Sequence, residues 1–328
     1  MSALRLLAAS CLTAVLFTAS ASAWDSLGHM LITQIASDQL TPEAKVAVDQ
    51  SLSRFNEDKK SDRPGEPAAY DIVTASCWMD DARAMPEKYS FSPWHYVNLP
   101  YTPEGLPEPD GGKEPNVIWA INHCTDIIEG KAADPAVNRD QALVMLLHLE
   151  GDAHQPLHTT NRGGDLGGNR VTLENEELSK EEKLFGKSAD GNLHAFWDSS
   201  YRRIFSDGKA KVAYEAPFYD KEKPIAGHAS ASAIIRREAS AIGKKYPPTF
   251  LTDQKDPEGW AHESHAVGYE LGYGKLSSDV SPDHKAKLNE HYVTAARDAA
   301  EQRIAMAGYR LGAMLNRLYG GTAATPVP

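Results

Sequence analysis

Residues 135–158 read PAVNRDQALVMLLHLEGDAHQPLH, and this stretch indicates the character of the fold. Its centre, residues 142–149, is a near-continuous apolar block that is too rich in leucine and methionine for a β-strand. Pro156 cannot continue a helix because it lacks a backbone N–H and its ring clashes with the preceding turn. The sequence therefore predicts a buried helix from Pro135 to His154.

Two polar side chains interrupt this apolar helix. His148 and Asp152 are four residues apart, so both leave the same helix face. A buried imidazole and a buried carboxylate with no basic partner nearby in the sequence would be costly to desolvate. A metal cation removes that cost and accounts for both residues.

The rest of the chain also predicts helices more often than strands. Apolar residues recur at helical spacing between proline and glycine stops, and Thr41-Pro42-Glu43 forms a helix start with a capping threonine. The expected helices are Leu27–Leu40, Ala68–Ala84, Asn116–Glu129, Ala229–Lys245 and Pro282–Tyr319. The expected loops are Pro100–Pro115 and Asn161–Asn192, the second with room for a short β-hairpin around Arg170–Leu173. With no internal repeat and no clear linker, the expected fold class is all-α, a single mainly helical domain.

Composition excludes several classes of protein. The 328 residues are 41% hydrophobic and 24% charged, which rules out wholesale disorder and low complexity. The formal net charge of −11 does not support the basic surface typical of duplex-DNA binders. Three cysteines are too few for a disulfide scaffold or a cysteine-rich zinc finger.

The first 23 residues predict an export signal. Arg5 gives a basic start, Leu6–Phe17 is apolar but too short to span a bilayer, and Ala21-Ser22-Ala23 fits a cleavage site. Cleavage would make Trp24 the new N-terminus and place the protein outside the cytoplasm, secreted or periplasmic. It would also leave Cys77 and Cys124, which could pair in an oxidising compartment.

Further histidines and aspartates extend the metal hypothesis. His194 and Asp198 in NLHAFWD repeat the spacing of four amid large apolar residues. Four more candidates lie in other segments, namely His158 in HQPLH, His95 in SPWHYVNLP, Asp80 in CWMDDAR and His29 near the expected N-terminus. Histidine and carboxylate ligands without cysteine favour a hydrolytic zinc site over a structural one.

Ordinary structural roles compete with this interpretation. A lone histidine on an apolar face is more often a core residue, and Asp80 could be only a capping residue or the ion-pair partner of Arg83. Trp94, Phe196 and Trp197 are more typical of a core than of a substrate site. His123 and His154 are expected beside the ligands or in the core. The remaining five histidines are expected at the surface or in the core, namely His228, His262, His265, His284 and His291.

The motifs, taken in order, carry a family resemblance. They are W-x4-H from Trp24, W-x-D-x-x-R from Trp78, W-H-Y-x-N from Trp94, H-x3-D-x-H-Q-P-L-H from His148, then G-G-N and N-L-H-x3-D. The series resembles the secreted zinc-dependent single-strand nucleases of the S-one/P-one type, to which zinc phospholipase C is a more distant relative. The resemblance covers Trp24 to about Tyr319. It implies a zinc nuclease domain over residues 24–320, followed by a disordered tail over 321–328.

The resemblance also implies three zinc ions in an all-α fold. The matching residues for the first zinc are Asp80, His95, His148 and Asp152. Those for the second are His158, His194 and Asp198. Those for the third are Trp24, through its freed α-amine and carbonyl oxygen, His29, and Asp152 as a bridge.

The implied activity is hydrolysis of phosphodiesters. Hydroxide shared between two close zinc ions would attack phosphorus in line, with Asp80 and Asp152 among the catalytic residues. Arg83 matches the family's arginine that steadies the pentacoordinate phosphate. The expected substrates are single-stranded DNA, RNA and nucleotides, with 5′-phosphorylated products and 3′-nucleotidase activity. Three Zn²⁺ ions would let an acidic protein attract a phosphodiester.

Substrate choice depends on two further matches. Tyr96 occupies the position of the family's base-stacking aromatic, and Asn98 stands where many relatives carry an aspartate that contacts the base edge. The acidic stretch 174–182 could repel nucleic acid or be only a solvated hairpin. The alternatives are a zinc phospholipase C acting on choline phospholipids and a non-catalytic zinc-binding protein. We expect a monomer with no stable protein partner.

Overall fold

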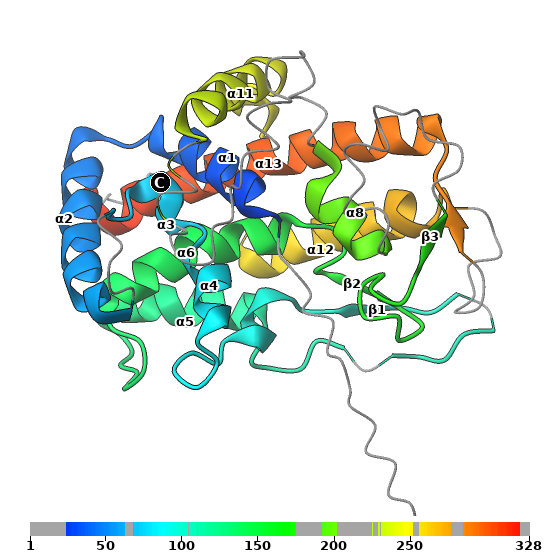
Figure 1. Cartoon of the computed structure of the whole chain (residues 1–328), viewed down its shortest axis with the longest axis horizontal. Helices are drawn as coiled ribbons and strands as arrows, with labels where there is room; N and C mark the ends of the chain where they lie inside the picture. The colour runs from blue at the N-terminus through cyan, green and yellow to red at the C-terminus, as the bar shows by residue number, and fades with distance from the viewer. Residues whose placement is uncertain are drawn as a thin grey trace, which may run out of the picture.

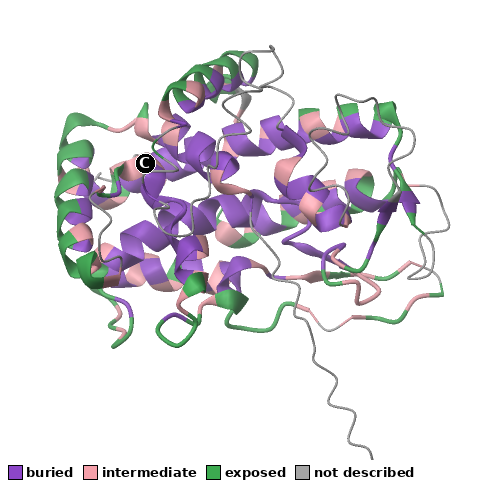
Figure 2. Cartoon of the chain, viewed as in Figure 1, coloured by how far each residue is buried: buried purple, intermediate pink, exposed green. Residues whose placement is uncertain are grey.

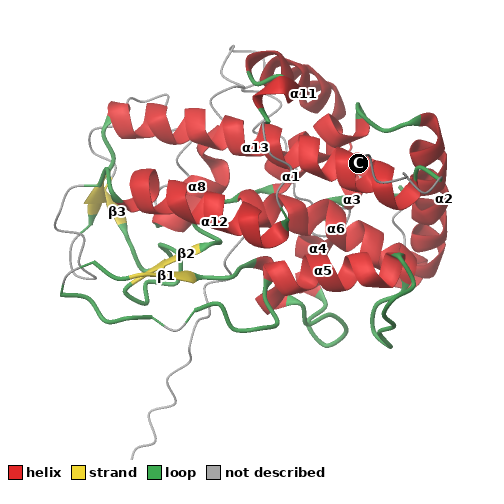
Figure 3. Ribbon diagram, turned by 180° about the vertical axis from the view of Figure 1, so that it is seen from behind, coloured by secondary structure: helices red, strands yellow, loops and turns green. Residues whose placement is uncertain are grey.

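The structure is a computed structural model that describes residues 24–62, 68–103, 105–109, 111–174, 192–201, 225, 229, 231–251, 256–276 and 285–321. Helices dominate these residues and the strands are short (Figure 3), which confirms the predicted single, mainly helical domain. The expected export signal, residues 175–191 of the expected loop and residues 322–328 lie outside the described residues. In the part of the chain that is described, no helix is long and apolar enough to cross a membrane.

Helix α6 (Arg139–His154) forms the centre of the fold. Fourteen of its 16 residues are buried, as the apolar block predicted. It begins four residues later than expected because Asn138 caps it, accepting a hydrogen bond from the Gln141 N–H at 2.9 Å.

Other long helices surround α6. They are α1 (Ser26–Ser37), α2 (Pro42–Asp58), α5 (Val117–Ile128), α12 (Pro257–Val267) and α13 (Glu290–Tyr319). Helices α5, α12 and α13 pack directly on α6, and α1 packs against both α6 and α13 (Figure 1). Buried residues concentrate on this inner group, whereas α2 exposes its outer face (Figure 2). Helix α11 (Ser232–Lys245) packs against α1 and α13.

The helix expected over Ala68–Ala84 is broken into short pieces. They are α3 (Ile72–Ala75), α4 (Trp78–Asp81) and the 3-10 turn η2 (Ala82–Ala84). At the break, the Ser76 carbonyl accepts a hydrogen bond from Nδ1 of His148 at 2.7 Å. A carbonyl inside a continuous helix would be occupied by the residue four positions later, so the break frees it for the histidine. The described ranges also contain the 3-10 turns η1 (Lys60–Asp62), η3 (Ser92–His95) and η5 (Pro248–Phe250).

Four helical elements differ from the sequence prediction elsewhere. Helix α12 and the π-helical turn η6 (Gly268–Tyr273) were not predicted. Helix α13 begins at Glu290 behind the capping Asn289, rather than at Pro282. Helix α8 (Leu193–Ser199) holds the second pair of candidate ligands in a segment for which only helical spacing was noted.

The strands form two small parallel pairs. Strand β1 (Leu99–Tyr101) pairs with β2 (Thr160–Arg162), and β3 (Leu173–Glu174) pairs with β4 (Ala286–Lys287). The hairpin expected around Arg170–Leu173 is replaced among the described residues by this parallel pairing and one antiparallel bridge, Thr172 to Asn192. Parallel pairing arises because distant segments, rather than a tight turn, supply the partners.

Cys77 and Cys124 do not form the disulfide that export would permit. Both are buried and free. The Cys77 thiol donates to the Ser26 carbonyl at 3.5 Å, whereas Cys124 lies 4.0 Å from the sulfur of Met145. Each thiol therefore packs in its own part of the core.

Candidate metal centre

Eight side chains that are far apart in the sequence converge in the interior. They come from α1 (His29), α4 (Asp80), η3 (His95), α6 (His148, Asp152), the turn after α6 (His158) and α8 (His194, Asp198). They form three groups, and the candidate ligand atoms within each group lie within 4.8 Å of one another. The groups are His29–His148–Asp152, Asp80–His95–His148 and His158–His194–Asp198.

Two helices each supply a pair of ligands by the same geometry. In α6, residues four apart bring the imidazole of His148 and the carboxylate of Asp152 to one face. In α8, His194 and Asp198 repeat this arrangement, and Asn192 caps the helix by accepting from the Ala195 N–H at 2.9 Å. One helical turn in α6 and one in α8 are therefore each enough to bring a histidine and an aspartate together as candidate ligands.

Backbone carbonyls orient three of the histidines. Nδ1 of His148, His158 and His194 each lies 2.7 Å from a carbonyl oxygen, that of Ser76, His95 and Gly167 respectively. A carbonyl can only accept, so Nδ1 carries the proton and Nε2 presents a lone pair to the cluster. This is the arrangement in which a histidine ligates a metal through Nε2.

Several separations between candidate ligand atoms suit a cation better than direct hydrogen bonds, whereas Nδ1 of His95 lies at hydrogen-bond distance, 2.9 Å, from Oδ2 of Asp152. Nε2 of His29 lies 3.6 Å from Oδ1 of Asp152, and Nε2 of His194 lies 3.7 Å from Oδ2 of Asp198. Nε2 of His148 is 3.2 Å from Oδ2 of Asp152. Zinc bonds of about 2.0–2.1 Å in a tetrahedron hold neighbouring ligand atoms roughly 3.3 Å apart. Most of these distances exceed the length of a good hydrogen bond, but they suit two ligands that bind the same ion.

Several buried polar atoms of the cluster have no hydrogen-bond partner among the described residues. They are both ring nitrogens of His29, Oδ1 of Asp152 and Oδ2 of Asp198. All three side chains lie in the interior, where an unsatisfied polar atom costs about 1–3 kcal/mol. A bound cation would satisfy these atoms together, so the residues present fit a metal site.

Burial sets the protonation of the ligands. It lowers the pKa of His29 and of His95 well below the ordinary 6.5, which leaves both neutral and able to ligate. Burial also opposes protonation of His148, but the carboxylates of Asp152 and Asp80 outweigh it and raise its pKa. Burial raises the pKa of Asp152 to about 6. A cation between these groups would favour the ionised carboxylate and the neutral imidazole.

The expected N-terminal residue lies beside the cluster. Trp24 is fully buried, and its indole Nε1 donates to the Gly151 carbonyl of α6 at 2.9 Å. The next backbone N–H, that of Asp25, donates to the Asp198 carbonyl at 3.1 Å. These contacts hold the start of the described chain between the two helices that carry the paired ligands.

The residues expected to contact substrate lie at the edge of the cluster. The guanidinium of Arg83 is 3.1 Å from Oδ1 of Asp80, and its side chain is 25% exposed. Tyr96 and Asn98 follow the candidate ligand His95 and are partly exposed. The Asn98 N–H donates to the His158 carbonyl at 3.2 Å, and Asn98 adopts a positive φ of 52°. The structure therefore brings these three residues to the same site.

Sequence reasoning missed the residues that support the ligands. Nε2 of Gln155 donates to Oδ1 of Asp198 at 2.5 Å, which fixes one ligand oxygen. Gly151 lies where a Cβ would come within 2.9 Å of Nδ1 of His29. Both belong to the quoted motif 148–158, so their place between ligands was the available signal. The role of the Ser76 carbonyl could not be predicted, because every residue carries a backbone carbonyl whatever its side chain.

The other histidines in the described ranges lie outside the three groups. His123 is half-buried, with Nε2 2.9 Å from Oδ2 of Asp134. His154 is buried, and its Nε2 accepts from Arg310 at 2.8 Å. His262 and His291 are exposed and His265 is half-buried. His228 and His284 lie outside the described residues.

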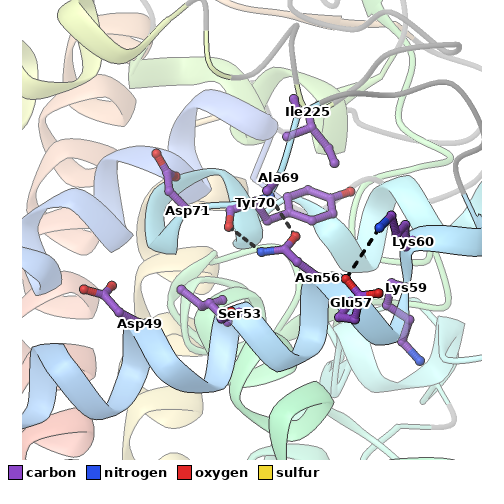
Figure 4. A pocket seen from close by; sticks show the side chains of 12 residues that line it. Asp49, Ser53, Asn56, Glu57, Lys59, Lys60, Ala69, Tyr70, Asp71 and Ile225 are labelled. Atoms are coloured by element: carbon purple, nitrogen blue, oxygen red, sulfur yellow. Dashed lines mark hydrogen bonds and ion pairs between the residues drawn. The ribbon is translucent and has the colours of Figure 1, made fainter.

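A cavity of about 500 Å³ lies elsewhere, beside the end of α2 (Figure 4). Asn56 crosses its floor, where its amide exchanges two hydrogen bonds with the backbone of Tyr70, at 2.8 and 2.9 Å. Its lining includes both acidic and basic side chains, such as Glu57 and Lys60. It shares no residue with the three groups and is not the site where they converge.

Comparison with known proteins agrees with this geometry. The family S1/P1 Nuclease matches residues 24–320. Endonuclease 2 of Arabidopsis thaliana is 27% identical over 309 residues, which cover 90% of this chain and 91% of the relative. Nuclease S1 of Aspergillus oryzae is 25% identical over 89% of this chain and 91% of its own. Nuclease P1 of Penicillium citrinum is 24% identical over 92% of this chain and 100% of its own.

Proposed function

Because this chain belongs to the S1/P1 Nuclease family, we propose that it cleaves single-stranded DNA and RNA to 5′-phosphorylated products and also acts as a 3′-nucleotidase. The observation that carries the proposal is the convergence of eight imidazoles and carboxylates, all buried except the partly exposed Asp80, in three adjacent groups. Such a cluster binds divalent cations, and adjacent divalent cations are suited to phosphodiester hydrolysis.

The proposed cofactor is zinc, with three ions per chain. The donors are imidazole nitrogens and carboxylate oxygens without any thiolate, which is typical of catalytic zinc. Asp80, His95, His148 and Asp152 would hold one ion, and His158, His194 and Asp198 a second. Trp24, His29 and Asp152 would hold the third. Bound zinc supplies a nucleophile of lowered pKa and positive charge opposite the phosphate.

Arg83 is proposed to stabilise the phosphate during the reaction. Its ion pair with Asp80 holds the guanidinium beside a metal ligand while part of the side chain stays accessible. A guanidinium offers two parallel N–H donors that match the oxygens of a phosphate. As negative charge develops on the phosphorus oxygens, these donors are already in place and need no reorganisation.

Tyr96 and Asn98 are proposed to bind one base next to the scissile phosphate. The ring of Tyr96 offers a stacking face, and stacking is worth roughly 1–3 kcal/mol per base without demanding a sequence. The side-chain amide of Asn98 can both donate to and accept from a base edge. An unpaired base enters such a site without the cost of unstacking, which favours single strands.

Export and metal binding are proposed to be linked through Trp24. Removal of residues 1–23 would free the α-amine of a residue that the contacts of its indole already hold beside the ligand helices. An α-amine ligates only when it is unprotonated and not part of a peptide bond. The proposal therefore places the active protein outside the cytoplasm, secreted or periplasmic.

The test is a digestion assay with added and removed metal. Protein beginning at Trp24 is incubated with single-stranded DNA, RNA and phosphatidylcholine vesicles, before and after chelation and again after zinc is restored. We expect chelator-sensitive, zinc-restored cleavage of both nucleic acids with 5′-phosphate ends. Cleavage of the lipid alone would instead identify a phospholipase C. Zinc binding without any hydrolysis would identify a non-catalytic protein.

A further inference from the structure

A cluster of aromatic side chains lies beside the strands that lead away from the metal ligands. It consists of Tyr101, Tyr269, Tyr273 and Arg162, which we call the tyrosine patch. Tyr269 is 49% exposed, one of three exposed large hydrophobic residues in the described part of the chain. Its ring lies edge-on to that of Tyr101, with centroids 4.6 Å apart and planes at 73°. An aromatic pair left open to solvent is a candidate binding surface.

The two parallel strands connect this patch to the metal centre. Strand β1 begins directly after Asn98, and β2 begins two residues after the ligand His158. Leu99 pairs with Thr160, and Tyr101 pairs with Arg162. Two residues of strand advance about 7 Å, so the patch lies roughly one extended nucleotide beyond the residues next to the ligands.

The π-helical turn η6 fixes Tyr269 in this place. Gly268 packs so closely on β2 that a Cβ there would overlap Oγ1 of Thr160. Only a glycine permits this approach. The next residue, Tyr269, is thereby held over the end of β1, where it meets Tyr101. Single π-turns inside helices often occur at functional sites, because they re-aim one side chain.

Arg162 adds a cation to the same surface. Its guanidinium lies over the ring of Tyr273 at 5.7 Å, and its backbone N–H donates to Oδ1 of Asp165 at 3.2 Å. The Tyr273 hydroxyl donates to the same carboxylate oxygen at 3.0 Å. Tyr273 is buried, so it forms a rigid base beneath the half-buried arginine. A stacking ring and a guanidinium side by side match a nucleobase and its phosphate.

We propose that the tyrosine patch is a second nucleotide subsite, in which the exposed ring of Tyr269, supported edge-on by Tyr101, stacks on a base and Arg162 contacts the backbone phosphate. This inference rests on the proposed function, because it assigns the patch to a neighbouring nucleotide of the same single-stranded substrate. A dinucleotide fills only the site at Tyr96 and Asn98 and the leaving position beyond the scissile phosphate, so a chain must be longer than a dinucleotide to occupy the patch as well. A nucleic acid fits better than a lipid surface because strand β1 joins the patch directly to Asn98, and because Arg162 offers a guanidinium that suits a backbone phosphate.

The test compares Tyr269→Ala with Tyr269→Phe, and uses Val46→Ala as a matched control. Val46 is 57% exposed on α2 and belongs to no part of the site. Affinity for a labelled twelve-nucleotide thymidine oligomer is measured by fluorescence anisotropy, and kcat/KM is measured for this oligomer and for a thymidine dinucleotide.

We expect Tyr269→Ala to weaken binding of the oligomer roughly 5- to 150-fold, since stacking contributes about 1–3 kcal/mol per base. The ratio of kcat/KM for oligomer over dinucleotide should fall by a similar factor. Tyr269→Phe keeps the ring and should keep the affinity, and Val46→Ala should match wild type throughout. Arg162→Gln should lower the slope of log affinity against log salt by about 0.7, the value for one lost single-strand phosphate contact.

The outcomes separate this inference from the proposed function. If wild type cleaves single strands but Tyr269→Ala retains full affinity for the oligomer, the subsite is refuted and the nuclease assignment stands. If wild type cleaves no nucleic acid, the proposed function fails first. Loss of phosphatidylcholine vesicle binding by Tyr269→Ala, with unchanged oligomer affinity, would assign the patch to lipid instead. A loss equal in Tyr269→Phe and Tyr269→Ala would also contradict stacking.

Discussion

Replacing Gly151 by alanine adds one methyl group at the contact between α6 and α1. A Cβ there would lie 2.9 Å from Nδ1 and 3.1 Å from Cε1 of His29, and 3.0 Å from Cδ1 of Ile32. Comfortable contacts begin at about 3.5 Å, so something must move by several tenths of an ångström. The His29 ring cannot retreat freely, because it stacks on the ring of His148 with centroids 3.8 Å apart.

The expected cost combines two opposing effects. Overpacking in a dense core costs about 1–3 kcal/mol. Alanine is better than glycine within a helix by about 1 kcal/mol, which offsets part of that cost. We therefore expect Gly151→Ala to lower the free energy of unfolding of the metal-free protein by about 0–2 kcal/mol. Because the displaced group is a proposed ligand, zinc affinity should fall about 10- to 100-fold, as for other residues that orient ligands.

Two other helical glycines give matched controls. Gly243 in α11 has only the Tyr309 hydroxyl near its Cβ position, at 3.5 Å, so Gly243→Ala should raise stability by about 0.5–1 kcal/mol. Gly308 in α13 faces Ile35 of α1, with Cβ contacts of 2.6 Å. Gly308→Ala should therefore destabilise the fold more than Gly151→Ala, yet leave zinc bound in the folded fraction.

The assay pairs urea unfolding of the metal-free proteins with zinc content after dialysis against a competing chelator. We expect the two variants to differ in which property falls most. Gly151→Ala should lose zinc affinity, whereas Gly308→Ala should mainly lose stability. If Gly151→Ala retains wild-type zinc while Gly308→Ala loses it, then Gly151 does not make room for a ligand and the reasoning is refuted.

Three further outcomes are expected. His148→Ala should abolish hydrolysis and lower bound zinc, because it removes a ligand shared by two groups; retained turnover would count against the assignment. Arg83→Lys should keep its zinc but lower kcat about 10- to 1000-fold, as measured on single-stranded DNA, and an unchanged kcat would exclude its role on the phosphate. Asp140 accepts two hydrogen bonds from Arg54 at 2.7 and 2.9 Å, and this pairing contributes to holding its pKa below 3.8 despite the opposing effect of burial. The carboxyl of Asp140 therefore stays ionised in the folded protein at pH values where it would be protonated in the unfolded chain. Its contribution to the free energy of unfolding is full above pH 3.8 and is lost as the pH falls through the folded-state pKa. Asp140→Asn should cost about 1–2 kcal/mol at pH 7 and 5 and less at pH 3, by urea unfolding; an equal cost at all three would contradict the pairing.

The central helix and the shared face of its two candidate ligands could be predicted because their signal is local. An apolar block ending in proline fixes a buried helix, and residues four apart on it share a face whatever surrounds them, as His148 and Asp152 do. The same rule holds for His194 and Asp198. That His29, from α1, meets Asp152 depends on packing between distant segments, which the ordered motifs of the family implied and spacing alone did not.

The features that the sequence did not predict depend on contacts between distant segments rather than on a local signal. Helix α12 carries few apolar residues at regular spacing, and its place on α6 depends on tertiary contacts. The break between α3 and α4 depends on the demand of His148 for the Ser76 carbonyl, which local propensity does not contain. Strands β1 and β2 are three residues each and pair in parallel across 61 positions of sequence, so neither shows an alternating pattern long enough to detect. The role of Gly151 was not predicted, because the close approach of His29 to this glycine produces no recurring pattern in the sequence.

Crystals of the protein beginning at Trp24, grown with zinc and measured at the zinc absorption edge, test the central claim most directly. We predict three anomalous peaks. One is bound by Asp80, His95, His148 and Asp152, a second by His158, His194 and Asp198, and a third by Trp24, His29 and Asp152. A zinc-loaded crystal with no peak among these side chains, or with a peak only on surface histidines such as His262, would contradict it.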